Sequence, residues 1–368
     1  MTGLRIAVPC GVAVMSALAA FAIAPRAFDA AFLLAVQDDP VALADHAIAH
    51  SFDTTVASRE INAALAAEDT DLAQSFVDLA RERNLPLDPA LVQRVAHTAE
   101  EAASTRRSLE SFARGFVTGE PKDSVGLAGT AVGDLFVFGD LRDAVREGAR
   151  FASGQQGDEL ILGLACVGLA VTAGTYATAG LSAPVRAGLT VIKAARKTGA
   201  IGGRMAAAIN RALRESVDWS ALERAAGKVS IFTPVASVRG VRDALKMEKT
   251  EGLVRLVGDV GRVQSKAGTR AAVEALRIAE TPGEMSRMAR LAVAKGPKTR
   301  AILKLAGRAA IMLTVATFDL AVWVFWGLLS AFGLVSSLKR TAERITERYC
   351  ARSRRLRAWA LAQSSDRA

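Results

Sequence analysis

Residues 160–183 read LILGLACVGLAVTAGTYATAGLSA, and none of these side chains carries a charge. A helix of that length runs about 36 Å, which exceeds the hydrocarbon core of a bilayer at about 30 Å. The stretch therefore predicts a transmembrane helix in the middle of the chain.

The charge of the chain changes sign across this stretch. Residues 27–159 hold 11 Lys and Arg against 23 Asp and Glu, whereas residues 184–308 hold 25 Lys and Arg against 10 Asp and Glu. Basic segments beside membrane spans stay in the cytoplasm and face anionic lipids. The pattern predicts a bacterial inner-membrane protein with its acidic N-terminal domain in the periplasm, its basic segment in the cytoplasm, and a bilayer containing anionic lipids as its partner.

A second apolar segment lies at the start of the chain. Residues 6–24, IAVPCGVAVMSALAAFAIA, follow a single Arg5 and contain small-x-small patterns typical of cleavage sites. The segment is also long enough to be an uncleaved anchor. Residues 1–26 are therefore either a signal peptide or a signal anchor, and both deliver the following residues across the membrane.

A third apolar segment, residues 309–338, contains one charge, Asp319. Basic residues lie on both sides of this segment, so the positive-inside rule favours the cytoplasm at both ends. Two topologies remain open: one long tilted helix that crosses the bilayer, or a re-entrant hairpin that bends near Trp326 and Gly327.

The remaining segments complete an all-α prediction, an integral membrane protein with an external helical-hairpin domain. Apolar spacing of three and four indicates helices before residue 118, with Thr54 or Thr55 and then Thr70 or Asp71 as starts. Amphipathic helices after residue 184 either lie on an anionic membrane surface or pack as a bundle. The predicted regions are 1–26 (signal or anchor), 27–118 (acidic periplasmic helical domain), 119–159 (Gly/Asp-rich connector), 160–183 (transmembrane helix), 184–308 (basic cytoplasmic helices), 309–338 (transmembrane or re-entrant segment) and 339–368 (basic tail).

Polar and small residues in the apolar segments are the first candidate functional groups. Asp319 lies about 16 Å into the third segment when that segment is measured from Arg308. It is either a proton or cation site or a protonated acid bonded to a neighbouring hydroxyl. Ala170, Gly174 and Thr178 lie four residues apart, and this spacing favours a smooth face on which another transmembrane helix packs.

Two weaker patterns concern metals. His46 and His50 are one helical turn apart, a spacing that places two imidazoles on one ion, but Ala47 stands where zinc proteases carry Glu. Asp134, Asp140 and Asp143 form either a loop site for a hard cation or a helix cap. Neither pattern identifies a metal, and we expect no cofactor.

The sequence contains no nucleophile elbow, phosphate-binding glycine loop or paired-carboxylate signature, so we expect no enzyme. The basic pI of about 9.9 comes with no groove-reading motif, and we therefore expect no nucleic-acid partner.

Residues 113–180, with weaker matches at 59–80 and 336–340, resemble a family of uncharacterised proteobacterial membrane proteins. That resemblance implies membrane residence and no assigned activity. The repeat of Gly-Asp at 133–134 and 139–140 is also similar to apolar segments that precede toxin domains in bacterial polymorphic toxins, although no toxin domain follows.

These features predict a non-catalytic envelope scaffold or adaptor that holds a protein partner or self-associates through its transmembrane helices. The alternative is a membrane-active or transport component in which Asp319 lines a path.

Overall fold

The computed structural model describes residues 4–49, 51–118, 143–144, 146–147, 150, 155, 158–175, 183–221, 246–313 and 317–365. These residues are overwhelmingly helical, which confirms the all-α prediction. The chain divides into two units, one formed by residues 1–37 and 313–368, the other by residues 38–312. We call the first the helix pair and the second the helical body.

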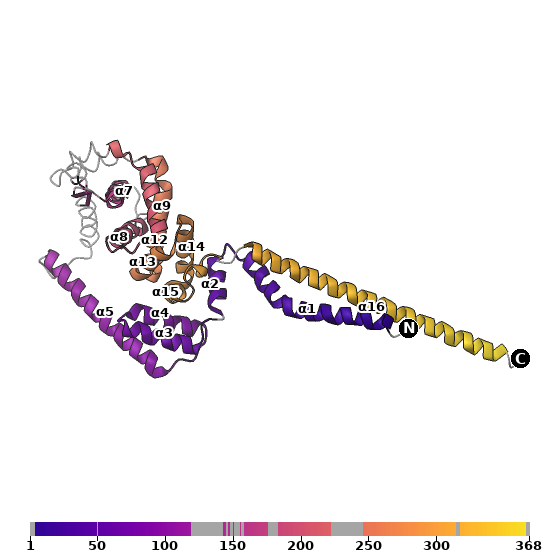
Figure 1. The fold of residues 1–368 in the computed structure, drawn as a ribbon. Coiled ribbons are helices and arrows are strands. Elements are labelled where there is room, and N and C mark those ends of the chain that lie inside the picture. Colours follow the sequence, from indigo (N-terminus) through magenta and orange to yellow (C-terminus); the bar gives the residue numbers. More distant parts are fainter. Residues whose placement is uncertain are drawn as a thin grey trace. The chain divides into compact units, whose positions relative to one another are not determined.

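The helix pair consists of α1 (Leu4–Ala35) and α16 (Thr317–Ser365), which run antiparallel and lie side by side along α1 (Figure 1). Their backbones approach closely, because a Cβ added at Gly327 would lie 2.5 Å from the Cβ of Ala27. Arg26 of α1 stacks 5.5 Å above the ring of Trp323. The two ends of the chain therefore meet in one unit.

Both members of the helix pair are long and apolar enough, by length and composition, to cross a membrane: Val14–Ala35 and Asp319–Arg354. α16 is continuous through Trp326 and Gly327, as the single-helix alternative predicts and the re-entrant alternative does not, and the basic tail continues the same helix. The segment also begins later than predicted. Gly307–Ala310 form a 3-10 turn, and Ala310 and Ile311 are fully buried in the helical body.

The helical body begins with an acidic segment. Asp53 and Asp69 cap the second and third of its helices through bonds to the backbone N–H groups of Val56 and Leu72. Each cap lies one residue before the threonine predicted to start the helix. The helices are α2 (Pro40–Ala49), α3 (Thr54–Ala66), α4 (Thr70–Glu82) and α5 (Pro89–Thr118).

The basic segment supplies the other helices of this body. Its predicted amphipathic helices pack as a bundle, with their apolar residues in one core that also contains Phe76 and Ile61 of the acidic segment. The elements are α8 (Ala183–Lys197), α9 (Gly203–Ser216), η1 (Met247–Lys249), α12 (Glu251–Ala267), α13 (Thr269–Ile278), α14 (Pro282–Lys295), η2 (Gly296–Lys298), α15 (Thr299–Ala306) and η3 (Gly307–Ala310).

The helix α7 (Glu159–Thr175) is where the structure departs most from the sequence interpretation. All residues from Leu160 to Leu169 are buried inside the helical body, and α7 packs on α8 and α9. Gly163 contacts the side chain of Leu213. An uncharged helix suits a protein core as well as a bilayer, so the predicted transmembrane helix is a core helix over residues 160–169.

Two glycines allow the central pair of the bundle, α8 and α12, to meet at backbone contact. A Cβ at Gly188 would lie 1.9 Å from the carbonyl oxygen of Val257, and one at Gly261 would lie 1.7 Å from that of Pro184. Neither backbone oxygen can move without separating the helices.

We therefore predict that Gly188→Ala and Gly261→Ala each lower the free energy of unfolding by about 1–3 kcal/mol, the usual cost of overpacking. Gly252→Ala, on the same α12 helix with open space around it, is the matched control and should be neutral or stabilising. Urea unfolding of the full chain in detergent measures all three. Equal effects at Gly261 and Gly252 would contradict this packing.

Candidate functional site

The acidic and basic segments are joined by a row of ion pairs that we call the ion-pair seam. Its members come from α2, α4 and the two cap residues of α4 on one side, and from α13, α14, η2 and α15 on the other. They are Asp45, Asp69, Glu82, Arg83, Arg270, Glu274, Lys295, Lys298 and Arg300.

Arg300 is the most enclosed cation of the seam, with 4% of its side chain exposed. Its guanidinium donates to both oxygens of Asp69, each at 2.8 Å, and to Glu274 at 2.5 Å. Arg270 reaches the same Asp69 carboxylate at 2.7 Å. A planar guanidinium held by two carboxylates ties α15 to the N-terminus of α4 and to α13.

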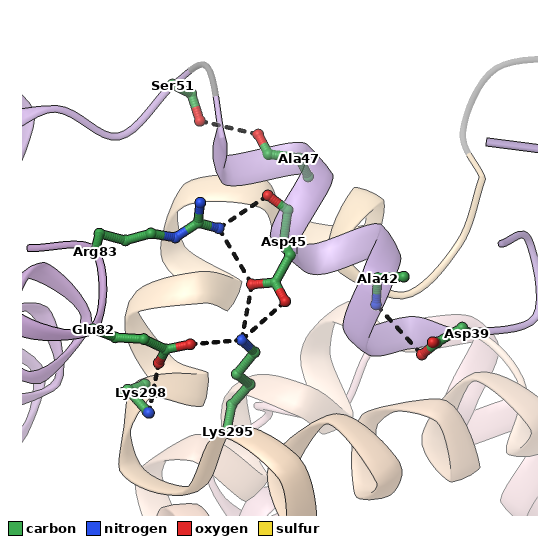
Figure 2. A network of polar contacts seen from close by, with 9 residues as sticks. All are labelled: Asp39, Ala42, Asp45, Ala47, Ser51, Glu82, Arg83, Lys295 and Lys298. Carbon is green, nitrogen blue, oxygen red and sulfur yellow. Dashed lines mark hydrogen bonds and ion pairs between the residues drawn. The ribbon is translucent and has the colours of Figure 1, made fainter. Parts of the chain in front are cut away.

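Lys295 forms the second centre of the seam. Its ammonium donates to Asp45 at 2.8 Å and to Glu82 at 2.8 Å, and 9% of its side chain is exposed. Figure 2 shows that Arg83 reaches Asp45 from the other side, while Lys298 reaches Glu82. Residues more than 200 positions apart in the chain therefore share one network.

A neutral contact lies between these two centres. The buried Ser75 hydroxyl of α4 donates to the carbonyl of Pro297 at 2.7 Å and accepts from the N–H of Ala301 at 2.9 Å. The residue before α15, Lys298, makes no side-chain cap bond. Ser75 thus caps a helix that begins 224 residues later in the chain, and it ties the two segments at the backbone level.

The electrostatics of the seam favour the charged state of its members. The hydrogen bonds from Arg300 lower the pKa of Asp69 to about 2, against the opposing effect of burial. Burial alone would lower the pKa of Lys295, but the hydrogen bonds to Asp45 and Glu82 outweigh it and raise that pKa. The same balance raises the pKa of Arg300.

The seam corrects the predicted sidedness. Asp69 and Arg300, from the segments predicted to face the periplasm and the cytoplasm, are in hydrogen-bond contact. Closer to α7, Asp158 pairs with Arg196 at 2.9 Å, and Glu159 pairs with Arg214 at 3.0 Å. No bilayer separates these pairs, so residues 38–118 of the predicted periplasmic domain and residues 184–308 cannot face opposite compartments in this fold.

The predicted site residues do not converge. Asp319 is exposed in the first turn of α16, where the helix dipole stabilises a carboxylate, and not deep in an apolar segment. It belongs to the helix pair, whereas Ala170 and Gly174 belong to α7 of the helical body. The side chains of those two residues, and Thr178 as a whole, lie outside the described residues.

The structure describes two of the five predicted metal-ligand candidates, His46 and Asp143. His46 is half-buried on α2, while His50 lies outside the described residues, as do Asp134 and Asp140. Asp143 is buried and pairs with Lys193 at 3.3 Å. Within the described part of the chain, no group of three or more His, Cys, Asp or Glu side chains could hold a metal ion.

Sequence reasoning missed the seam because it counted charges by segment and did not pair them. The signal that was present is the near-cancellation of the two segments: residues 38–312 hold 36 Lys and Arg against 32 Asp and Glu. Because the numbers of basic and acidic side chains are nearly equal, most of them can form ion pairs within one folded body.

No protein-family model, curated protein or solved structure matches this chain.

We predict that Asp69→Asn destabilises the helical body at pH 7 by about 1–2 kcal/mol, after allowance for partial exposure of the carboxylate. Asn keeps the helix cap and removes the charge. Because the folded pKa lies below the unfolded value, the contribution is complete above about pH 4 and disappears as the pH falls through about 2.

Urea unfolding of the full chain in detergent between pH 7 and pH 2 measures this difference. Asp71→Asn, an exposed acid in the first turn of the same helix, is the control and should change stability by less than about 0.5 kcal/mol. A deficit in Asp69→Asn that persists unchanged at pH 2 would exclude the ion pair as its cause.

Proposed function

We propose that this chain is a membrane-anchored, non-catalytic scaffold or adaptor. In this proposal α1 and α16 cross a bilayer together, as an antiparallel pair, and the helical body is held at the membrane surface to bind a protein partner. The membrane is the inner membrane of a bacterium.

The observation that carries the proposal is the direction of the apolar side chains in the helix pair. Phe21 is 84% exposed, Phe28 75%, Phe332 71% and Phe325 61%. Two helices alone enclose little surface, so these rings have no protein core to enter. Exposed apolar surface on this scale is typical of a membrane-embedded face, because hydrocarbon accepts it at no cost.

The pairing also favours an uncleaved anchor over a signal peptide. α1 is continuous from Leu4 to Ala35 and runs through both small-x-small patterns. Cleavage at Ala19 or Ala22 would remove the part of α1 around Ser16, whose hydroxyl lies near Gly333. The anchor therefore needs both ends of the chain.

The positive-inside rule supports an orientation with both termini in the cytoplasm. Residues 339–368 hold nine Lys and Arg against three Asp and Glu, and Arg5 stands at the other end. An antiparallel pair of crossings puts its two termini on one side and the intervening residues on the other. The whole helical body, basic segment included, is then periplasmic.

An adaptor role fits how the charges of the helical body are used. Arg300, Lys295 and Ser75 are occupied in joining α4 to the α14–α15 corner. Their groups act as structural connectors that make one rigid body from two segments. A rigid body on a two-helix anchor is a suitable platform for a partner.

The direct test changes the outward face of α16. We predict that the wild-type chain sediments with membranes and resists carbonate at pH 11, and that Phe325→Arg/Phe332→Arg is released. Each Arg costs about 2.5–3.5 kcal/mol near the centre of a span. Phe325→Leu/Phe332→Leu keeps the apolar face and should stay in the pellet. Carbonate release of the wild-type chain would refute the anchor.

A further inference from the structure

A basic groove lies between α12 and α14 of the helical body, and no member of the ion-pair seam lines it. Its volume is about 490 Å³. Four guanidinium groups line it, and Val293, 54% exposed, forms part of its apolar side. We call it the arginine groove; its charged lining residues are Arg255, Arg262, Arg287, Arg290 and Asp259.

The acid in the groove does not neutralise it. Asp259 is buried, and its carboxylate is already bound by Arg262 and by the hydroxyl of Ser286. Within the described part of the chain Arg255 pairs with Glu251 alone, and the two side chains are 65% and 79% exposed. An ion pair so exposed stabilises little and exchanges readily.

Arg290 is the group best placed to bind an anion. It is exposed, and it donates a 3.4 Å hydrogen bond to the backbone carbonyl of Asp38. Among the described residues no carboxylate lies within ion-pair distance of it. Counted with their carboxylate partners Glu251, Asp259 and Asp38, the four arginines leave one net positive charge, which Arg290 carries.

The groove also lies where the chain enters and leaves the helical body. Arg287 donates to the Asp38 carboxylate at 2.9 Å, to the carbonyl of Ile311 at 3.3 Å and to the sulfur of Met312 at 3.4 Å. Asp38 and Met312 are the first and last residues of the body. One arginine therefore holds both connections to the helix pair.

Chain length limits how far this point can be from a membrane that the helix pair crosses. Asp38 follows the last residue of α1 by three positions, and Met312 precedes α16 by five. Fully extended, these connections reach about 11 Å and about 18 Å. The headgroup layer is itself about 5–7 Å thick on each side.

We propose that the arginine groove binds the phosphate of an anionic phospholipid headgroup in the leaflet that the helical body faces. This inference rests on the proposed membrane anchor. Guanidinium groups bind phosphate oxygens in a bidentate manner and are less strongly hydrated than ammonium groups. Val293 provides an apolar contact for the glycerol and upper acyl region of the lipid.

The test measures binding of dioctanoyl phosphatidylglycerol to the full chain in a zwitterionic detergent, by native mass spectrometry. We expect the wild-type chain to retain this lipid in preference to dioctanoyl phosphatidylcholine. Arg255→Gln/Arg290→Gln should bind it about thirtyfold more weakly, which corresponds to about 1 kcal/mol for each basic residue.

Arg211→Gln/Arg277→Gln is the matched control, because both residues are exposed arginines of the same body outside the groove. It should bind like the wild-type chain. Equal binding of the two lipids, equal loss in both double variants, or no loss in Arg255→Gln/Arg290→Gln would overturn the proposal.

A further arm distinguishes lipid from free phosphate. Inorganic phosphate at millimolar concentration should leave phosphatidylglycerol bound, and full displacement would assign the groove to a soluble anion and overturn the lipid assignment. The short-chain lipid is soluble, so the assay does not depend on the anchor. Loss of the anchor in carbonate extraction with retained lipid selectivity would refute the proposed function alone.

Discussion

Burial of the Arg300 guanidinium between Asp69 and Glu274 is the constraint on which the rest of the helical body depends. A cation that is 4% exposed must keep its carboxylates, because an unpaired buried charge costs several kcal/mol. α4 and α15 are therefore held together, and Ser75 completes the N-terminus of α15. The Lys295 centre repeats this arrangement one helix away.

This constraint changes the meaning of the charge pattern. The sign change across residue 160 is real, but its physical cause is complementarity between two segments of one folded body. Charge counted by segment cannot distinguish two domains on opposite sides of a bilayer from two halves that pair with each other. The distinction requires knowing that Asp69 and Arg300 meet, and no local spacing carries that information.

Hydropathy is ambiguous in the same way. The apolar stretch that begins at Leu160 and the apolar part of α16 both lack charges apart from Asp319, yet the first is buried in protein from Leu160 to Leu169 and the second is exposed along a helix pair. Local features were more predictable. The sequence predicts the starts of α3 and α4 to within one or two residues. Asp53 and Asp69 are the N-caps of these helices because a short carboxylate reaches the N–H groups of the first turn. The sequence predicts close helix packing at Ala170, Gly174 and Thr178. The described contacts that leave no room for a Cβ lie instead at Gly188 and Gly261. They depend on how α8 and α12 cross in three dimensions, which local spacing does not reveal.

We conclude that the acidic and basic segments occupy one compartment as one folded body. Labelling with a membrane-impermeant maleimide tests it most directly, using single cysteines at two exposed positions, Asn62→Cys in α3 and Ser265→Cys in α12, in a Cys10→Ser/Cys166→Ser/Cys350→Ser background. We expect the same labelling at both positions in intact cells, and labelling of both positions in permeabilised cells. Labelling of one position with protection of the other in intact cells would place a bilayer between the two segments and refute a shared compartment.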